Sequence, residues 1–336
     1  MIIQLEKNIN TADKDSLLQE IEAIGYKSNP VNTQDGNYLI CIGKQEFDIR
    51  RIGHHKGVKD LHRVSDNYKL VSSKWKVGRT AIDLGDGVLI GNGHFHMMAG
   101  PCSIESEEQV ESVVAQLVKS GVRIMRGGVY KPRSSPYSFR GMGMDGLKMF
   151  YQHCRSNGIK IITEVMQVSQ IEDMLPYVDI FQVGARNSQN FNLLDALGRI
   201  DKAVMIKRGI SGSIDELLYS AEYVFSNGNE KLLLCERGIR SYEQAYRNTL
   251  DLNAIPILKE KTHLPIIADP SHGIGIRRHV SPMALASVAA GADGVIVEMH
   301  PKPEQAVSDA AQTLSFGEFE GMIEKVRKVR EVVTEF

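Results

Sequence analysis

The amino-acid sequence predicts a closed (β/α)8 barrel, the TIM-barrel class of α/β folds, preceded by a small α+β domain. Three observations favour this fold. Strand-like and helix-like patterns alternate eight times after residue 96, the strand-like segments are apolar and too short to be helices, and polar residues follow each of them. Segments of this kind are typical of buried parallel strands, and eight repeats indicate a closed barrel. A doubly wound open sheet is the weaker alternative, because it usually has fewer strands.

Residues 1–70 are predicted to form a separate domain, and residues 71–336 the barrel domain. The expected order of strand, helix, strand, strand, short helix and strand indicates a ferredoxin-like module. Thr11 or Asp13 is the expected helix cap, and an Asp-Gly-Asn turn joins the second and third strands. The elements are expected at Met1–Leu5, from Thr11 to Ile24, at Tyr26–Val31, at Tyr38–Ile42, within Ile49–Leu61 and at Leu61–Val64.

The barrel domain is expected to begin with a hairpin within residues 80–96 that covers one end of the barrel. Its eight strands are expected at Met97–Gly100, Val122–Arg126, Lys160–Glu164, Ile180–Val183, Ala203–Lys207, Lys231–Cys235, Pro265–Asp269 and Gly294–Glu298. The clearest helical patterns lie at Glu107–Ser120, Asp145–Asn157, Ser213–Ser226, Met283–Ala290 and Glu318–Val333.

Composition excludes several classes of protein. A length of 336 residues suits a barrel with a small appendage. The net charge of −1 argues against a nucleic-acid-binding surface, and no apolar run is long enough to cross a bilayer. The N-terminus lacks a signal-peptide pattern, and the four cysteines have no disulfide-framework spacing, so we expect a reduced, cytoplasmic protein.

Cations gather where the predicted strands end. The carboxyl ends of parallel strands meet at one face, so these side chains are expected to share a cleft that binds an anionic substrate with phosphate and carboxylate groups. The plainer interpretation is that lysine and arginine often flank barrel strands and stay solvated. The candidates at strand ends and in nearby loops are Arg126, Lys131, Arg133, Arg186, Lys207, Arg208, Arg237, Arg277 and Arg278.

A second set of candidates suits a metal ion. Cys102, His272 and Glu298 follow predicted strands, and Asp309 lies one short loop beyond Glu298. One thiol, one imidazole and two carboxylates favour manganese, iron, cobalt or zinc over magnesium or calcium. The spacing is not a local motif, and His300 is a competing ligand candidate.

The segment KPRSS, from Lys131 to Ser135, follows the second strand. Lys131 and Arg133 supply two cations, Ser134 adds a hydroxyl, and Pro132 stiffens the backbone that presents them. Such a loop suits a phosphate group. Taken alone, it is also compatible with a basic surface turn.

Several segments together resemble one enzyme family. AGPCSIES, RGGVYKPRSSPYSFRGMG, QVGARNSQNFNLL, IKRG, CERGIRSYE, DPSH and VEMHPKPEQAVSD occur in the order found in 3-deoxy-D-arabino-heptulosonate-7-phosphate (DAHP) synthases. The resemblance covers about residues 80–315 and is closest to the short branch with an N-terminal ferredoxin-like extension. It implies a barrel enzyme that condenses phosphoenolpyruvate with erythrose 4-phosphate and releases phosphate, the first step of the shikimate pathway.

The resemblance also implies residue roles. Cys102, His272, Glu298 and Asp309 match the family's divalent-metal ligands, with manganese the first expectation. Glu164 lies in the same cleft and, like Lys131, is a candidate for proton transfer. The phosphoenolpyruvate positions match Arg126, Lys131, Ala185, Arg186, Lys207 and Arg237, and the aldose-phosphate loop matches Pro132, Arg133 and Ser134. The chain departs from the family pattern at Ile276, where an arginine often stands before Arg277 and Arg278.

Two alternatives remain at this stage. The sister family, 3-deoxy-D-manno-octulosonate-8-phosphate synthase, uses arabinose 5-phosphate, but its aldose loop typically has Ala-Asn where this chain has Pro132. A barrel that only senses metabolites would have no need for a full set of metal ligands. The resemblance further implies a homo-oligomer, a dimer or a tetramer, whose N-terminal domain binds an effector such as tyrosine, phenylalanine or prephenate.

Overall fold

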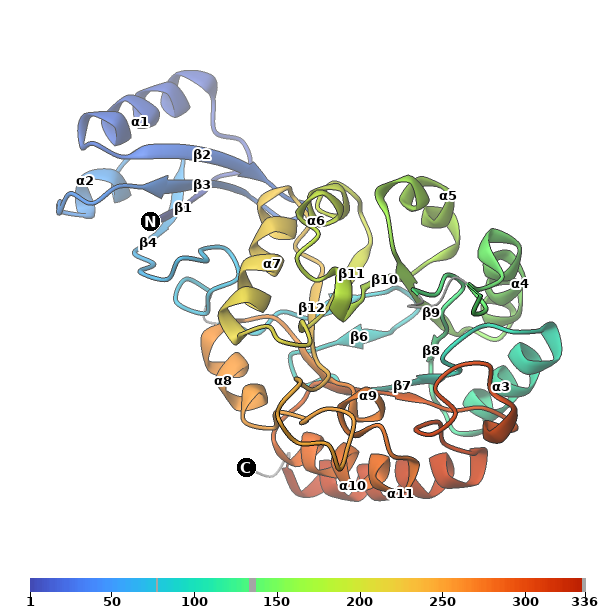
Figure 1. Cartoon of the computed structure of the whole chain (residues 1–336). Coiled ribbons are helices and arrows are strands. Elements are labelled where there is room, and N and C mark those ends of the chain that lie inside the picture. Colours follow the sequence, from blue (N-terminus) through green and yellow to red (C-terminus); the bar gives the residue numbers. More distant parts are fainter. Residues whose placement is uncertain (77, 133–136, 334–336) are drawn as a thin grey trace.

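The computed structural model describes residues 1–76, 78–132 and 137–333. Within them, eight parallel strands close a barrel, each pairing with the next along the chain until the last returns to the first (Figure 1). The predicted (β/α)8 barrel is confirmed. The strands are β7 (His96–Gly100), β8 (Ile124–Arg126), β9 (Lys160–Val165), β10 (Ile180–Val183), β11 (Ala203–Lys207), β12 (Leu232–Glu236), β13 (Ile266–Ala268) and β14 (Gly294–Glu298).

Helices surround this barrel (Figure 1). They are α3 (Glu107–Lys119), α4 (Gly143–Ser156), α5 (Ile171–Met174), α6 (Phe191–Leu197), α7 (Ile214–Ser226), α8 (Ala254–Lys261), α9 (Pro270–Ile274), α10 (Arg277–Ala289) and α11 (Phe316–Val333), with 3-10 turns η1 (Val168–Gln170), η2 (Leu175–Tyr177), η3 (Ala185–Asn187) and η4 (Pro303–Gln305). Serine caps begin two of the predicted helices: Ser106 accepts the Gln109 N–H at 3.1 Å, and Ser213 forms a capping box with Glu216.

One strand illustrates why the apolar runs become barrel strands. In β11, Ala203 and Met205 pack inside the barrel, and Val204 and Ile206 pack against the surrounding helices. Successive side chains of a strand point to opposite faces, so a strand covered on both faces must be apolar at every position.

The expected hairpin is formed by β5 (Ile82–Asp83) and β6 (Leu89–Ile90). Ile82, Val88 and Ile90 belong to the same buried cluster as the side chains inside the barrel. Asp86, at the turn, accepts a hydrogen bond from the ammonium of Lys160, the first residue of β9, at 2.8 Å. The hairpin therefore closes the amino-terminal end of the barrel.

The N-terminal segment forms an antiparallel four-stranded sheet in the order β2-β3-β1-β4. Leu17 and Ile21 of the first helix pack with Ile3 and Leu39 of the sheet. The element order is the predicted one, but the second helix is a single turn, so the ferredoxin-like assignment stays a prediction. The elements are β1 (Ile2–Leu5), α1 (Thr11–Ala23), β2 (Lys27–Asn32), β3 (Asn37–Ile42), α2 (Arg50–Gly53) and β4 (Val58–His62).

The sheet and the segment after it are tied to the barrel beside α7 (Figure 1). Glu222 of α7 accepts the backbone N–H groups of Leu70 and Val71 at 2.9 and 3.0 Å. The carboxylate of Glu230, just before β12, accepts from the Thr33 hydroxyl and the Asp35 N–H at the tip of the β2–β3 hairpin. Two carboxylates of the barrel domain thus hold the N-terminal segment through three backbone N–H groups and one hydroxyl.

Three local predictions are corrected. The cap of α1 is Asn10, whose side chain accepts the Asp13 N–H at 2.8 Å, so neither Thr11 nor Asp13 caps it. The last strand of the sheet is β4, earlier than predicted because its pairing with β1 ends at His62. Helix α10 begins at Arg277, earlier than the predicted Met283, so Pro282 lies inside it.

Pro282 lies in the second turn of α10, where it removes one backbone hydrogen bond without ending the helix.

No helix within the described residues combines the length and the apolar character needed to span a lipid bilayer.

Candidate functional site

The strand ends converge on a cleft of about 470 Å³ at the end of the barrel opposite the hairpin. Because the strands are parallel, the residues that follow them reach one rim from different parts of the chain. The cleft is lined by Arg126, Lys131, Pro132, Ser138, Glu164, Gln182, Gly184, Ala185, Arg186, Lys207, Ile210, Arg237, Arg240, Arg247, Asn248, His272, Ser308 and Asp309.

Three of the predicted metal ligands lie together beside this cleft. One ligand atom each from Cys102, Glu298 and Asp309 lies within 4.8 Å of the other two. The Cys102 thiol is 3.2 Å from Asp309 Oδ2. Nε2 of His272 is 3.5 Å from Glu298 Oε1 and 3.8 Å from Asp309 Oδ2. The four residues proposed from the sequence therefore face one small volume.

Local structure explains how the ligands are presented. Glu298 is the last residue of β14, and Cys102 follows β7 by two residues. His272 lies in α9, whose N-cap is Asp269, and Asp269 accepts the His272 N–H at 3.0 Å. Asp309 has a φ of 55°, in the left-handed region, where aspartate is one of the few non-glycine residues that is tolerated.

The imidazole of His272 is oriented for a ligand. Its Nδ1 is 2.8 Å from Asp269 Oδ2, an arrangement in which Nδ1 carries the proton and the Nε2 lone pair faces Glu298 and Asp309. Burial lowers the pKa of His272, although Asp269 opposes this, so the neutral ring is favoured. Burial would raise the pKa of Asp269, but its contacts with His272 and with the Lys207 ammonium hold that pKa well below its usual range.

The donor set fits a borderline divalent metal. A thiol with an imidazole and two carboxylates suits manganese, iron, cobalt or zinc. Burial, reinforced by the charge of Glu298, raises the pKa of the Cys102 thiol to about 11. Binding of a metal through a thiolate would therefore release a proton.

Three cations of the cleft have different partners in the protein. Arg126 bonds Glu298 Oε1 and the Pro101 carbonyl, both at 2.9 Å. The Lys207 ammonium is 2.5 Å from Asp269. Lys131 donates to the Cys102 carbonyl at 2.9 Å.

Two further predicted cations have guanidinium N–H groups that are free to bind a ligand. Arg237 is 5% exposed, and within the described residues its side chain bonds only the Gly238 carbonyl, at 3.2 Å. Burial lowers its pKa. Arg186 is exposed and has no charged partner in the described part of the chain. Both guanidinium groups can therefore donate hydrogen bonds to an incoming phosphate or carboxylate.

Glu164 and Pro132 line the cleft as the sequence predicted. A Cβ at Gly184 would lie 2.1 Å from Glu164 Oε1, so the Glu164 carboxylate keeps this position only beside a glycine. Arg133 and Ser134, predicted to bind the aldose phosphate, lie outside the described residues.

Four sequence-based candidates lie elsewhere. Arg277 and Arg278 begin α10 outside the cleft lining, and Arg277 pairs with Glu304 at 2.7 Å. Arg208 points to the opposite face from its neighbour Lys207, away from the cleft, and pairs with Glu236 and Asp251 at 2.9 and 2.8 Å. The imidazole of His300 bonds Glu105 at 3.4 Å rather than joining the ligand cluster.

Sequence reasoning missed several lining residues, among them Gln182, Arg240, Arg247 and Asn248. Arg240, Arg247 and Asn248 lie in the long segment between β12 and α8. The signal that could have found them is the length of this segment, since long loops at the carboxyl face of a barrel commonly carry binding residues.

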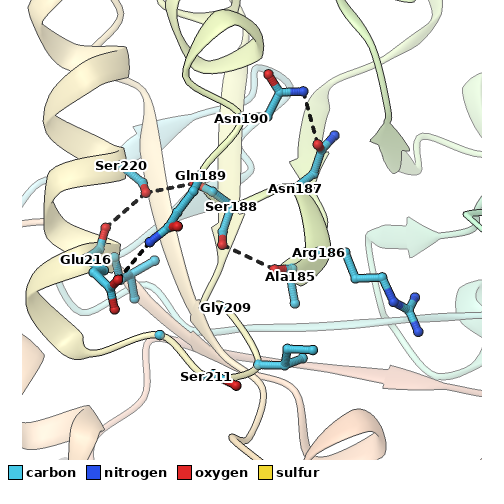
Figure 2. Close-up of a pocket in the computed structure, with 13 residues that line it drawn as sticks. Ala185, Arg186, Asn187, Ser188, Gln189, Asn190, Gly209, Ser211, Glu216 and Ser220 are labelled. Atoms are coloured by element: carbon cyan, nitrogen blue, oxygen red, sulfur yellow. Dashed lines mark hydrogen bonds between the residues drawn. The ribbon is translucent and has the colours of Figure 1, made fainter.

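A second hollow of about 660 Å³ lies between the segments that follow β10 and β11, and shares Ala185, Arg186 and Ile210 with the cleft. Its polar side chains bond one another, as Figure 2 shows: Gln189 donates to Glu216 at 2.8 Å, and Asn190 to Asn187 at 3.1 Å. Arg186 extends away from this group (Figure 2). The hollow therefore offers few free donors, and the chemistry belongs to the cleft.

The fold and the cleft define a class of protein, a (β/α)8 barrel enzyme whose site combines cations with side chains that suit a metal. Residues 75–335 match the family model described as the DAHP synthetase I family, and the chain belongs to this family.

Comparisons with individual proteins agree. Phospho-2-dehydro-3-deoxyheptonate aldolase of Thermotoga maritima is 41% identical over 334 residues, 99% of this chain and 98% of that protein. A crystal structure of this aldolase, also called DAHP synthase, from Thermotoga maritima matches with a TM-score of 0.79 at 40% identity, covering 99% of this chain and 97% of that one. The 2-dehydro-3-deoxyphosphooctonate aldolase of Syntrophobacter fumaroxidans is more distant, 31% identical over 74% of this chain and 91% of that protein.

Proposed function

We propose that this chain joins phosphoenolpyruvate to erythrose 4-phosphate with water, giving 3-deoxy-D-arabino-heptulosonate 7-phosphate and phosphate. One observation carries the proposal: the thiol, imidazole and carboxylates of a metal-type cluster lie beside a row of cations in a single cleft. This combination suits an anionic substrate that reacts with a carbonyl compound. Membership of the DAHP synthetase I family supports the same reaction.

Cys102, His272, Glu298 and Asp309 would hold a divalent metal, with manganese the first expectation. When bound, the metal supplies Lewis-acid polarisation of the aldehyde oxygen of erythrose 4-phosphate. Asp269 keeps the His272 ring oriented, and Arg126 partly balances the charge of Glu298.

Arg186 and Arg237 would bind the phosphate and carboxylate of phosphoenolpyruvate, with Lys131, Lys207 and Arg126 alongside and Ala185 completing the lining. A fixed array of cations aligns C3 of phosphoenolpyruvate with the aldehyde carbon. Arg133 and Ser134 with Pro132 would receive the phosphate of the four-carbon sugar, as the resemblance to the family implies.

The proposed bond changes balance. C3 of phosphoenolpyruvate attacks the aldehyde carbon, forming the new C–C bond, while the aldehyde oxygen takes up a proton. Positive charge develops at C2, and water adds there and loses one proton, which leaves a hydroxyl on C2. The C2–O bond to phosphate then breaks, the hydroxyl proton passes to the departing phosphate, and C2 becomes a ketone. No oxidant or reductant is needed.

Lys131 and Glu164 are the proposed groups for these proton transfers. Burial alone would lower the pKa of Lys131, but Cys102, Glu164 and Glu298 more than offset this, so its pKa is raised and Lys131 is charged at neutral pH. We assign Lys131 the donor role and Glu164 the acceptor role.

The second candidate is the octulosonate reaction, which uses arabinose 5-phosphate. A relative named 2-dehydro-3-deoxyphosphooctonate aldolase aligns with 74% of this chain. Pro132 in the predicted aldose loop favours the shorter sugar. The experiment is a phosphate-release assay with phosphoenolpyruvate and each aldose in turn, with and without Mn²⁺ after chelation. Release only with erythrose 4-phosphate and metal supports the proposal, whereas a preference for arabinose 5-phosphate refutes it.

Cys102→Ala tests the metal assignment directly. It removes the soft donor of the four-residue set, so bound metal and turnover should both be lost. Metal content by elemental analysis is the first readout and phosphate release the second. Full activity of Cys102→Ala after chelation would show that the cluster is not a metal centre.

We further propose that residues 1–70 form a regulatory domain of a cytoplasmic homo-oligomer, a dimer or a tetramer, which binds tyrosine, phenylalanine or prephenate. Two observations support this: the segment carries none of the cleft-lining residues, and it packs as its own sheet with its own core. The alternative is a domain that only stabilises the barrel.

A further inference from the structure

Gln312 is buried next to the metal-type cluster but does not line the cleft. It is 1% exposed, and it lies in the segment between β14 and α11 that also carries Asp309. Its side-chain nitrogen donates to Glu298 Oε2 at 2.7 Å, and its side-chain oxygen accepts from Arg247 at 2.7 Å. A buried amide with both ends bonded is held in one orientation.

The charges around Gln312 determine which way its amide faces. Arg247 can only donate, so it must meet the amide oxygen. The amide nitrogen then donates to Glu298 Oε2. Arg126 bonds the other carboxylate oxygen, Oε1. Each oxygen of the Glu298 carboxylate therefore has its own donor, and the carboxylate cannot rotate without breaking one of these bonds.

Arg247 extends the same support to the other ligands. The Arg247 Nη1 group that donates to Gln312 also donates to Asp309 Oδ1, at 3.0 Å. The Arg247 backbone N–H donates to the Ile274 carbonyl at 3.1 Å, at the end of the helix that carries His272. A Cβ at Gly275 would lie 2.3 Å from Arg247 Cβ, so only glycine allows this close approach.

Asn248 completes the contacts with α9, because its side chain donates to the His272 carbonyl at 2.9 Å. Arg247, Asn248 and Gln312, the support network, thus touch the segments that carry Glu298, Asp309 and His272. Two of its members come from the β12–α8 segment, which supplies none of the four proposed metal ligands.

We propose that the support network positions three of the four metal ligands, with Gln312 as the positioning residue that fixes the Glu298 carboxylate. The inference rests on the proposed metal centre. Groups that bond to metal ligands without touching the metal typically change metal affinity about 10–100-fold when they are removed. Gln312, which the cleft does not expose, should act on the metal and not on substrate binding.

The test is the affinity of the metal-free, full-length protein for Mn²⁺. The electron paramagnetic resonance signal of free Mn²⁺ measures this affinity during a titration. Gln312→Met keeps the size of the side chain and removes both hydrogen bonds. It should weaken Mn²⁺ binding about 10–100-fold, with turnover restored by excess Mn²⁺ and the KM values for both substrates near those of the wild type. Gln312→Glu keeps the acceptor for Arg247 but places a carboxylate against Glu298, so it should not rescue binding.

Arg277→Met is the matched control. Arg277 also anchors the β14–α11 segment, through Glu304 and the Ala310 carbonyl, but touches no proposed ligand. The Mn²⁺ affinity of Arg277→Met should equal that of the wild type, because a partly exposed ion pair contributes little to the stability of the segment.

Three results decide the matter. If Gln312→Met melts at a lower temperature without metal yet binds Mn²⁺ as tightly as the wild type, Gln312 is only structural and the inference is overturned. If Gln312→Met does not fold, Arg247→Met, at a partly exposed side chain, must show the same loss of affinity, and normal binding there overturns the inference. A wild type that binds no Mn²⁺ overturns both the inference and the proposed metal centre, whereas the first two results leave the metal centre intact.

Discussion

Arg237 is a buried cation whose charge is balanced by few partners in the protein without substrate. Its side chain bonds one carbonyl, and burial lowers its pKa, whereas Lys207 nearby is paired with Asp269. A buried charge without a partner costs free energy, and a bound anion removes that cost. Arg237 is therefore better prepared than Lys207 for binding the carboxylate or phosphate of a substrate.

Arg237→Ala should raise the KM for phosphoenolpyruvate about 10–100-fold, since a lost charge-assisted contact costs about 1.5–3 kcal/mol. The melting temperature should stay the same or rise, because a poorly compensated buried charge is removed. Arg133→Ala, chosen from the sequence, should instead raise the KM for erythrose 4-phosphate. Steady-state kinetics with each substrate varied in turn is the measurement, and equal effects of both variants on both substrates would contradict this division of the cleft.

His263 couples stability to pH at the junction of the N-terminal segment and the barrel. Its Nε2 is 2.9 Å from the Leu70 carbonyl, which can only accept, so Nε2 carries the proton and Nδ1 accepts from the Thr80 hydroxyl at 2.7 Å. Burial lowers the pKa of His263 to about 3. The folded state therefore holds a neutral ring that a second proton would disrupt.

The sign of the effect follows from linkage. The folded pKa lies below the unfolded value, so the stability contribution is complete above about pH 6.5 and is lost as pH falls towards 3. At pH 5 the loss should be about 2 kcal/mol. In His263→Gln the free energy of unfolding, measured by urea titration, should depend less steeply on pH between 7 and 5, while the exposed His279→Gln serves as the control. An unchanged slope in His263→Gln would contradict the assignment.

Site residues at strand ends could be predicted from the sequence, and those on long connections could not. Cys102, Lys207 and Glu298 follow from strand positions alone, because parallel strands share one carboxyl face. Gln312 and Arg247 lie on segments without periodicity, whose paths depend on tertiary contacts. Nothing in their spacing shows that they meet.

At the scale of elements, apolar runs buried on both faces identified all eight barrel strands, whereas helix starts were less certain. The pattern predicts a helix from Met283, but α10 begins at Arg277 and contains Pro282. Proline is tolerated in the first turns of a helix and need not be its first residue. The sequence pattern therefore predicts that a helix is present but not where it starts.

The β5–β6 hairpin should contribute stability without contributing chemistry. Ile90 is fully buried at the end of the barrel opposite the cleft. Ile90→Ala should lower the free energy of unfolding by about 2–5 kcal/mol, because it leaves a cavity that a closed barrel cannot collapse to fill. Below the melting temperature, turnover and both KM values should match the wild type. Chemical denaturation and kinetics on one preparation measure the two effects, and a loss of turnover in folded Ile90→Ala would mean that the hairpin also shapes the cleft.

At the scale of the whole molecule, the link between the sheet and the barrel sets where the chain can be divided. Leu70 and Val71 are fully buried, and they bond to Glu222 and His263 of the barrel. Residues from Leu70 onward thus belong structurally with the barrel. Residues before it have a core of their own around Ile3, Leu17 and Leu39, while Val31 and Tyr38 on the other face of the sheet pack with the barrel cluster.

Removal of residues 1–69 should therefore leave a folded barrel with most of its turnover, because the cleft and its supports lie entirely beyond residue 100. If the N-terminal segment is regulatory, full-length protein should be inhibited by tyrosine, phenylalanine or prephenate, and the shortened chain should not. An effector shifts activity only by binding two states of the protein unequally, so losing the segment must abolish inhibition rather than weaken it slightly. The measurement is phosphate release against effector concentration for both chains. Inhibition that survives the truncation would place the effector on the barrel, and a full-length protein insensitive to all three compounds would leave the segment a stabilising domain while the catalytic proposal stands.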